Sequence, residues 1–427
     1  MKESYSRYTY YPDIPKDAKC CFCQGGNLEG LIRVNYPVRL ENDLLGYKEI
    51  VDAACSDCGL VQRHPMPSPD QLMAFYSGQQ DIKFILTTEN KYEGDYLIEN
   101  IKKDQFYYLF NKLELQERIN IRNICEIGVF EGAFLSIAQR NGYIVGGFEP
   151  SEHAEIASSN LGVKIKKEFF GKDSLFSIDP DIVAILHVLE HVSDPVIFLE
   201  TVINVVKKTS TKNPYFFIEV PNLLGFSSND LGPFSNLEHT YNFTKNSLIR
   251  VLRKSGLAVL HCDVYSDRPI IRCICQFNYN SSCNYQNIDE LISEDLKKIK
   301  DLLDEHQANL LTLDIKIKNI LAWVKSSSKR LIIHAAGIHT IRLLDRYPEL
   351  LLHVDSIVDA DRQLWGKSIK GILITEPNPL GYQGRGCLIS SYAYQNNIFH
   401  YVNTNYKPVK IFNLYDNVIS HENFINK

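Results

Sequence analysis

Apolar and polar positions alternate along the chain in a way that predicts most of its regular structure. Between about residues 85 and 285, short apolar runs alternate with amphipathic stretches, as in a parallel sheet with crossover helices. The strands predicted there are 123–127, 144–148, 182–186 and 215–220. A final pair, 258–265 and 270–277, reads as an antiparallel hairpin on the sheet edge.

The C-terminal part of the chain changes pattern twice. From residue 288 to 324, apolar residues recur at three- and four-residue steps, which predicts a long helix. Beyond it, strands are predicted at 330–334, 356–358, 387–389 and 409–414, which indicates a second, smaller α/β unit. The predicted organisation is an N-terminal module, an α/β domain, a helical connector and a C-terminal α/β domain, over residues 1–80, 85–285, 286–326 and 327–427.

Composition supports a globular chain and excludes several classes of protein. At roughly 150 residues per domain, 427 residues suggest about three domains. Hydrophobic residues make up 44% and charged residues 23%, so disorder is not favoured. The net charge of -5 offers no basic field for nucleic acid. We expect a cytoplasmic protein without a membrane span, because no run of about 18 apolar residues and no signal peptide is present.

Two C-x-x-C pairs, Cys20 with Cys23 and Cys55 with Cys58, predict a zinc-binding N-terminal module. Each pair can direct both thiolates to one ion, and four sulfur ligands leave no open position, so the zinc should be structural. The alternatives are four unrelated buried cysteines or thiol exchange, which needs only one pair. The remaining cysteines near the predicted hairpin are expected to pack without a second metal; they are Cys262, Cys273, Cys275 and Cys283.

A glycine-bracketed turn between a strand and a helix forms a candidate cofactor site. Gly128 and Gly132 follow the apolar strand that contains Glu126, and glycine lets the backbone approach a ligand closely. Glu149 ends the next strand, where an acidic residue can accept both hydroxyls of a ribose. A nicotinamide dinucleotide would use the same geometry, so these residues alone leave the cofactor open.

Three motifs resemble those of class I S-adenosylmethionine methyltransferases, and the third is the most distinctive. They are Glu126-Ile127-Gly128, Gly147-Phe148-Glu149-Pro150-Ser151, and His187-Val188-Leu189-Glu190-His191-Val192-Ser193-Asp194-Pro195. The resemblance implies a Rossmann-like domain that binds S-adenosylmethionine. Glu126 would lie near the methionine part, Glu149 would bind the ribose, and the residues after the strand 182–186 would border the sulfonium. The cofactor-binding candidates are Glu126, Gly128, Gly132, Glu149, Pro150, His187, Leu189 and Glu190.

The order of the modules resembles that of the zinc-containing sugar C-methyltransferases of deoxysugar biosynthesis across nearly the whole chain. The stretches Phe75-Tyr76-Ser77 and Leu237-Glu238-His239-Thr240-Tyr241-Asn242-Phe243 fit the same pattern, and Phe130-Glu131 would replace the Asn-Asp pair of that family. The resemblance implies His239 as the general base, with Tyr76 and Glu238 as further catalytic candidates. Asn236 stands where the family has a tyrosine, and Tyr241 is a candidate substitute.

The acceptor implied by this resemblance is a nucleotide-linked keto-sugar, methylated at carbon. The alternatives are O-methylation of a sugar or polysaccharide precursor, and a non-catalytic scaffold that binds the donor. The stretches 335–340, 358–361 and 365–367 resemble nucleotide-binding modules, with Ala335 in the first glycine place. His339 is there either a ligand contact or a group that caps the start of a helix.

Overall fold

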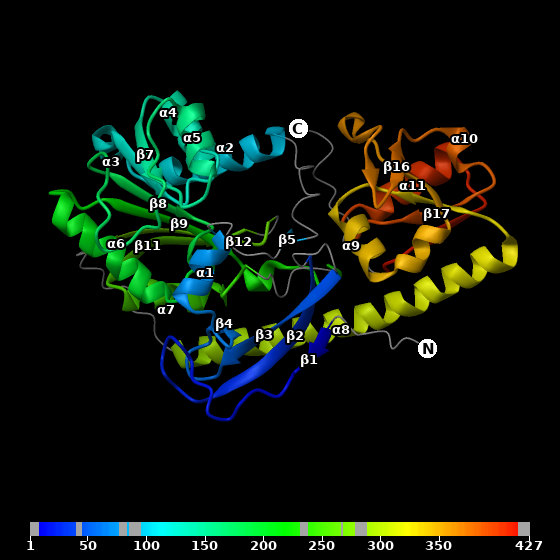
Figure 1. The fold of residues 1–427 in the computed structure, drawn as a ribbon, viewed down its shortest axis with the longest axis horizontal. Coiled ribbons are helices and arrows are strands. Elements are labelled where there is room, and N and C mark those ends of the chain that lie inside the picture. The colour runs from blue at the N-terminus through cyan, green and yellow to red at the C-terminus, as the bar shows by residue number, and fades with distance from the viewer. Residues whose placement is uncertain are drawn as a thin grey trace. The chain divides into compact units, whose positions relative to one another are not determined.

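The computed structural model describes residues 8–39, 45–76, 83–84, 95–230, 238–265, 268–277 and 288–416 (Figure 1). These fall into two compact units. The first comprises Met1–Phe226 and Phe234–Asp301, and the second comprises Ser227–Pro233 and Leu302–Lys427. Ser227–Pro233 therefore belongs to the C-terminal unit, although in sequence it falls between two strands of the first unit.

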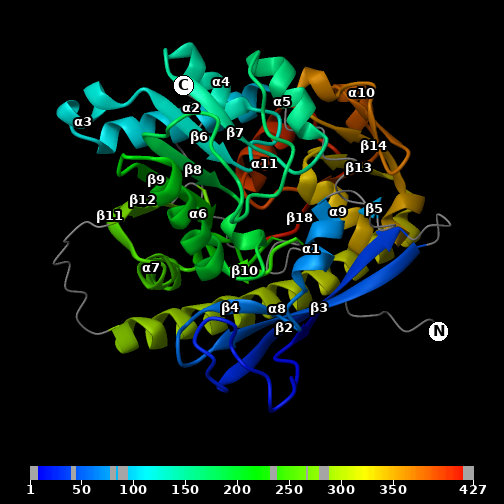
Figure 2. The same cartoon turned by 60° about the vertical axis from the view of Figure 1, so that its left-hand side comes forward.

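The N-terminal segment forms an antiparallel sheet. Its strand order is β1 (Tyr8–Tyr10), β2 (Leu28–Arg39), β3 (Leu45–Cys55), β4 (Val61–His64) and β10 (Tyr241–Asn242), and β5 (Lys83–Phe84) also pairs with β2. Figure 2 shows β4 and β10 close together, although they are far apart in sequence. Helix α1 (Pro69–Tyr76) follows β4.

The second sheet has the order β11 (Leu257–Val264), β12 (Ile270–Phe277), β9 (Tyr215–Pro221), β8 (Ile182–Leu186), β6 (Asn123–Ile127) and β7 (Ile144–Phe148). The last four strands are parallel, whereas β12 runs antiparallel to both of its neighbours. The predicted strands and the edge hairpin are confirmed. All five residues of β8 are buried, which explains its continuous apolar run.

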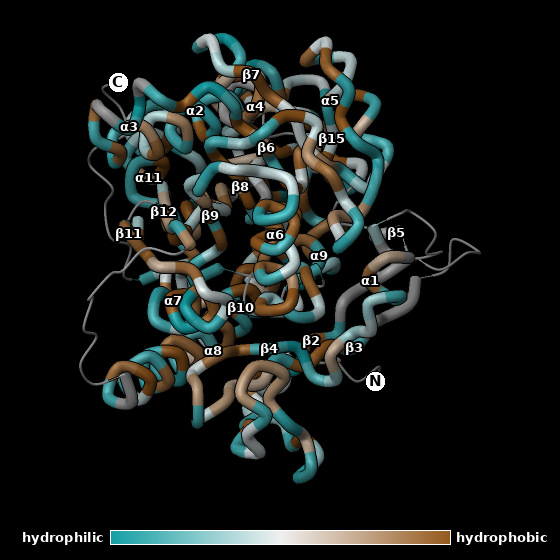
Figure 3. The backbone as a smooth tube through the Cα atoms, turned by 90° about the vertical axis from the view of Figure 1, so that its left-hand side faces the viewer, coloured by the Kyte–Doolittle hydropathy of each residue, from teal (hydrophilic) through white to brown (hydrophobic). Residues whose placement is uncertain are grey.

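Helices cover both faces of this sheet. Alternate residues of β8 face opposite clusters: Val183 and Ile185 pack with residues of α6 (Pro195–Thr209) and α7 (Lys245–Lys254), and Ile182 and Ala184 pack with α2 (Asp95–Lys112) and α4 (Ala133–Arg140). Figure 3 shows hydrophobic and hydrophilic residues alternating along α6 and α7, as expected for helices with one buried face. The shorter elements are α3 (Leu115–Asn120), α5 (His153–Leu161) and the 3₁₀ turns η1 (Leu189–His191) and η2 (Leu223–Gly225).

Helix α8 (Ile288–Ser327) is continuous over 40 residues, as the periodicity predicts. The sheet of the C-terminal unit has the order β15 (Ser368–Ile369), β16 (Ile372–Thr375), β14 (Val354–Val358), β13 (Leu331–His334), β17 (Gly386–Ile389) and β18 (Lys410–Asn413). All but β15 are parallel. Its helices are α9 (Ile338–Arg346), α10 (Pro379–Tyr382) and α11 (Gln395–Asn405), with 3₁₀ turns η3 (Pro348–Leu352) and η4 (Arg362–Leu364). Among the described residues, no helix combines the length and apolar character needed to cross a membrane.

Candidate functional site

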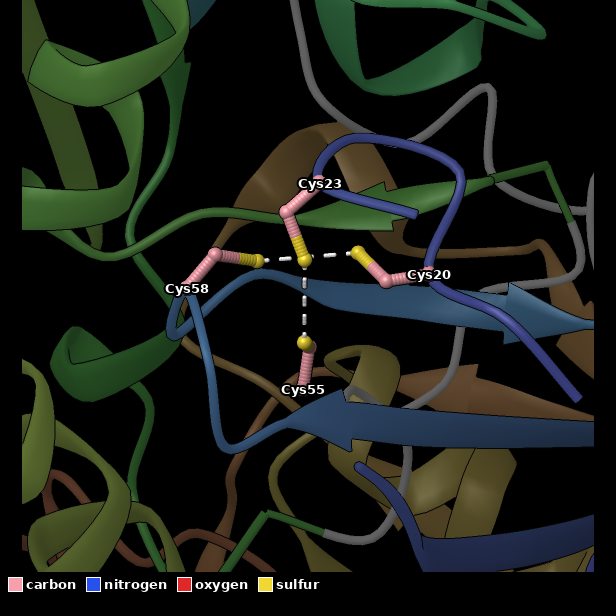
Figure 4. A group of neighbouring side chains, drawn as sticks. All are labelled: Cys20, Cys23, Cys55 and Cys58. Atoms are coloured by element: carbon pink, nitrogen blue, oxygen red, sulfur yellow. Dashed lines mark hydrogen bonds between the residues drawn. The ribbon is translucent and has the colours of Figure 1, made fainter. Parts of the chain in front are cut away.

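Four cysteine sulfurs converge beside the N-terminal sheet (Figure 4). Sγ of Cys20 lies 3.5 Å from Sγ of Cys58, and Sγ of Cys23 lies 3.5 Å from Sγ of Cys55. All four sulfurs lie within 4.8 Å of one another. Sulfurs about 2.3 Å from one tetrahedral ion would be roughly 3.8 Å apart, so the spacing suits a single metal ion.

Tight turns present these thiols to a common point. The amide of Gly25 approaches Cys23 Sγ at 3.4 Å, and the amide of Cys20 donates to the Gly25 carbonyl. In the other pair, Gly59 has a φ of +74° and its amide donates to the Cys55 carbonyl at 2.8 Å. The turn closes with a residue in the left-handed conformation, and glycine adopts this conformation at little cost.

The predicted donor turn has the backbone geometry that its glycines suggest. Gly128 and Gly132 have φ values of +82° and +85°, and Gly132 caps the start of α4. A β-carbon on Gly128 would lie 2.5 Å from Cγ2 of Val188. The turn after β6 therefore packs directly against the segment that follows β8, which brings the first and third sequence motifs together.

The Glu149 carboxylate holds this turn in place. Oε2 accepts a hydrogen bond from the Phe130 amide at 2.9 Å, and Oε1 accepts from the amide and the hydroxyl of Ser151 at 3.0 and 2.5 Å. Pro150 links these two residues and is half-buried. Phe130 has a φ of +50°, and its exposed ring lies against His153. The backbone amide of Phe130 is thus held in the turn by its hydrogen bond to Glu149, the residue predicted to bind the ribose.

Glu126 lies at the end of β6 with only 2% of its surface exposed. Among the described residues its Oε2 atom has no hydrogen-bond partner. Burial raises the pKa of Glu126 to about 8, Lys102 opposes this shift, and Glu149 adds to it. A buried carboxyl without a donor is suited to receive a cationic or hydrogen-bonding group of a ligand.

His187 is fixed between two buried carboxylates. Its Nε2 lies 2.8 Å from Oε1 of Glu219, and its Nδ1 lies 3.2 Å from Oε1 of Glu190. Burial opposes the charged ring, but the two carboxylates outweigh it and raise the pKa of His187 to about 9. Glu219 is in turn bound by Arg272, which is fully buried, and by Gln105 at 2.6 Å. His187 has a φ of +57°, so this network holds a strained residue next to the donor turn.

A second cluster gathers the predicted catalytic residues. The rings of His191 and His239 lie 5.0 Å apart, and the ring of Tyr76 lies 5.7 Å from that of His191. His191 Nδ1 lies 3.0 Å from the backbone carbonyl of Glu238, and the Tyr76 hydroxyl donates to the same carbonyl at 3.5 Å. Glu190 completes the group, with its Oε1 atom 3.7 Å from His191 Nε2.

The charges in this cluster are set by burial and by the neighbouring groups. Burial lowers the pKa of His239 to about 3, and His191 adds to the effect. Burial opposes ionisation of Glu190, but the histidines around it outweigh this and lower its pKa. At neutral pH the His239 ring is therefore uncharged while Glu190 is ionised, and burial raises the pKa of Tyr76 so that its hydroxyl stays protonated.

The position of His239 depends on a strand that the sequence did not reveal. β10 begins two residues after His239 and pairs with β4, with Tyr241 opposite Gln62. The Arg63 guanidinium donates to the His239 carbonyl at 2.6 Å, and Arg63 itself is paired with buried Asp52. The run from Val61 to His64 has one apolar residue followed by three polar ones, so it shows no alternation that would identify a strand or its partner.

Other candidates take structural positions. Leu189 is fully buried in the core, so its side chain is packed there. Tyr241 is also fully buried, and its hydroxyl donates to the Ser193 carbonyl at 2.9 Å. It therefore cannot take the role of the tyrosine that sugar C-methyltransferases have at the position of Asn236. Asn236, Leu237 and Ser77 lie outside the described residues.

In the C-terminal unit, the nucleotide-binding candidates are bonded to one another. His339 places Nδ1 2.9 Å from the Ser390 hydroxyl and Nε2 2.5 Å from the Tyr415 hydroxyl, and burial lowers its pKa to about 4. Asp359 accepts a hydrogen bond from the Ala336 amide at 2.8 Å. His339 thus fastens the start of α9 to the ends of two other elements.

Comparison with known proteins identifies the central domain. The family model described as a methyltransferase domain matches residues 94–262. No curated protein matches the chain. Among solved structures, an S-adenosylmethionine-dependent methyltransferase from Aquifex aeolicus is 16% identical, covering 42% of this chain and 96% of its own, with a TM-score of 0.32. The 1,6-didemethyltoxoflavin-N1-methyltransferase from Burkholderia thailandensis is 9% identical, covering 54% and 96%, with a TM-score of 0.37.

The matched residues contain the donor turn, Glu149 and the segment after β8. Residues 94–262 of the chain therefore match a methyltransferase domain.

Proposed function

We propose that the protein methylates a carbon atom of a nucleotide-linked keto-sugar, with His239 as the general base. The observation that carries this proposal is the cluster of Tyr76, His191 and His239 beside the segment that packs on the donor turn. A base must be unprotonated before it accepts a proton, and burial keeps the His239 ring neutral at physiological pH.

In this reaction His239 takes a proton from the carbon next to the sugar ketone. The resulting enolate carbon attacks the methyl group of the sulfonium in line, the carbon–sulfur bond of the donor breaks, and S-adenosylhomocysteine leaves. Tyr76 is a hydrogen-bond donor beside the same histidines and is suited to an acceptor oxygen. Glu149 binds the ribose of the donor and Glu126 faces its methionine part.

We assign the four cysteines to one structural zinc ion, because four thiolates in a closed shell leave no position for substrate. The ion joins the turn at Cys20 to the turn at Cys55, and the latter leads directly into β4. Because β4 pairs with β10 and Arg63 holds the His239 carbonyl, the zinc module supports the backbone of the proposed base.

Deuterium exchange tests the base role directly. Wild type, given its keto-sugar and a donor analogue that cannot transfer methyl, should label the carbon beside the ketone in heavy water. His239→Asn should keep donor affinity, lose this label and lower turnover by about 10² to 10⁴. His400→Asn, a change at an exposed position of α11, is the matched control and should behave as wild type.

Two results contradict the proposal in different ways. Full turnover by His239→Asn rejects the base role. Methylation at oxygen with no carbon label supports the rival reaction on a sugar hydroxyl, in which a base needs only to assist an alcohol.

A further inference from the structure

Glu190 is a buried carboxylate that forms an ion pair with His187 but accepts no hydrogen bond from the residues that the structure describes. Only 1% of its surface is exposed, and among the described residues neither Oε1 nor Oε2 has a hydrogen-bond partner. His187 Nδ1 lies 3.2 Å from Oε1, but this ring is shared with Glu219. His187 supplies a counter-charge, but no described group donates a hydrogen bond to either oxygen, so the carboxylate is suited to a further ligand.

The rings of His191 and His239 lie close to this carboxylate. One ring nitrogen each from His191 and His239 and one oxygen of Glu190 lie within 4.8 Å of one another. The nearest measured pair is His191 Nε2 and Glu190 Oε1, at 3.7 Å. Ligands on one ion at about 2.1 Å lie roughly 3.0 to 3.4 Å apart, so small side-chain rotations would bring these three atoms to one centre.

The orientation of His191 is the one found in metal-ligating histidines. A backbone carbonyl can only accept, so the contact of Nδ1 with the Glu238 carbonyl at 3.0 Å requires Nδ1 to donate. In the neutral ring Nε2 then carries the lone pair, and it faces Glu190. A ligating histidine usually donates its other ring nitrogen to a carbonyl or carboxylate in this way.

The backbone around these side chains is also fixed. The Thr240 amide and hydroxyl both donate to the Glu190 carbonyl, at 2.8 and 2.9 Å, which fastens the His239 segment to η1. The charge of nearby Arg63 is balanced by Asp52 at 3.2 Å. The three candidate ligands therefore come from two segments that are held together without any ion.

We propose that Glu190, His191 and His239 form a second metal site, which binds a divalent transition-metal ion through one carboxylate oxygen and two imidazole nitrogens. This site is separate from the four cysteines. Two imidazoles and a carboxylate suit ions such as Mn²⁺, Fe²⁺ or Zn²⁺, and three protein ligands leave coordination positions open. The neutral His239 ring has one lone pair, so metal binding and the proposed base role exclude one another in the same molecule, and metal binding itself does not depend on the identity of the acceptor.

Manganese titration of the full-length protein, isolated with its zinc, tests the site. Mn²⁺ favours oxygen and nitrogen ligands over thiolates, so the cysteine cluster should not compete. Electron paramagnetic resonance of free Mn²⁺ should show one ion bound per chain in wild type. Glu190→Gln should bind Mn²⁺ at least about tenfold more weakly. Loss of a residue that only hydrogen-bonds to a metal ligand already lowers metal affinity by about 10- to 100-fold, and loss of a ligand should lower it at least as much. Glu200→Gln, at an exposed position of α6, should match wild type.

Cobalt provides the second measurement if Glu190→Gln folds poorly. Co²⁺ at this site should give weak visible bands without the intense thiolate charge-transfer absorption of a cysteine site, and His239→Asn should remove those bands. Wild type that leaves all Mn²⁺ free at millimolar concentration overturns the proposal, as does equal binding by wild type and a folded Glu190→Gln. These measurements report metal binding, whereas the deuterium experiment, run without added metal, reports the base role of His239 in the metal-free site.

Discussion

Replacing Glu149 by glutamine should weaken S-adenosylmethionine binding, and the structure allows the effect to be worked out. The carboxylate already accepts three hydrogen bonds, from the Phe130 amide and from the amide and hydroxyl of Ser151. A carboxylate offers about four lone-pair sites. Two ribose hydroxyls therefore need one of the three existing donors to leave, and the Ser151 hydroxyl is the one that can rotate away.

In Glu149→Gln the charge is lost and an amide N–H₂ replaces one oxygen. The amide then faces either the Phe130 N–H or the ribose. Hydrogen bonds to a charged group are worth about 1.5 to 3 kcal/mol, against about 0.5 to 1.5 kcal/mol for neutral ones. Summed over two ribose hydroxyls, the loss is about 2 to 3 kcal/mol, or roughly 30- to 150-fold in the dissociation constant.

Calorimetric titration with S-adenosylmethionine measures this loss. Glu152→Gln, an exposed neighbour on the same turn, is the matched control and should bind as wild type. Ser151→Ala should bind at least as tightly as wild type, because it removes the donor that the ribose must displace. A Glu149→Gln affinity within twofold of wild type would refute the reasoning and move the ribose elsewhere.

Three further changes test other parts of the site. Cys55→Ser should abolish stoichiometric zinc in metal analysis and lower turnover more than donor affinity, because the module supports the His239 backbone; unchanged zinc content would reject the four-cysteine assignment. Glu219→Gln should destabilise the protein in urea by about 3 to 5 kcal/mol, since it leaves buried Arg272 without its closest counter-charge; a loss below about 1 kcal/mol would contradict this. Glu126 has a pKa raised to about 8 when folded and roughly 4.3 when unfolded, so folding takes up a proton between these values and stability falls as pH rises through them. Glu126→Gln lacks this pH-dependent loss, so its free energy of unfolding in urea should rise relative to that of wild type by about 2 to 4 kcal/mol between pH 5 and 8.5. A difference that does not change with pH would show that the carboxyl is ionised in the folded protein.

The parallel strands could be predicted from sequence because burial on both faces leaves a local signal. Ile182–Leu186 is apolar at every position, and its predicted bounds agree with the structure. The donor turn was equally local, since Gly128 and Gly132 sit where a strand ends and a helix begins. The tight turn requires positive φ values at both positions, and glycine is the residue that adopts them at the lowest cost, which is why glycine occurs there.

The surroundings of His239 could not be predicted, because they depend on contacts between distant parts of the chain. β10 is only two residues long, too short for any periodicity, and it exists because β4 offers it an edge. Arg63 and Asp52 form their pair within the N-terminal sheet, and nothing in the sequence near either residue points to a histidine far along the chain.

This placement gives a physical reason for joining the N-terminal module to the methyltransferase domain. A loop that carries a general base must hold its ring to within a fraction of an ångström, yet loops are the most variable part of an α/β domain. Here the loop becomes a strand of a second sheet, and Arg63 binds the His239 carbonyl directly. A closed four-thiolate site at the head of β4 stiffens that sheet in our proposal, so a zinc ion that contacts neither donor nor acceptor still decides where the base stands.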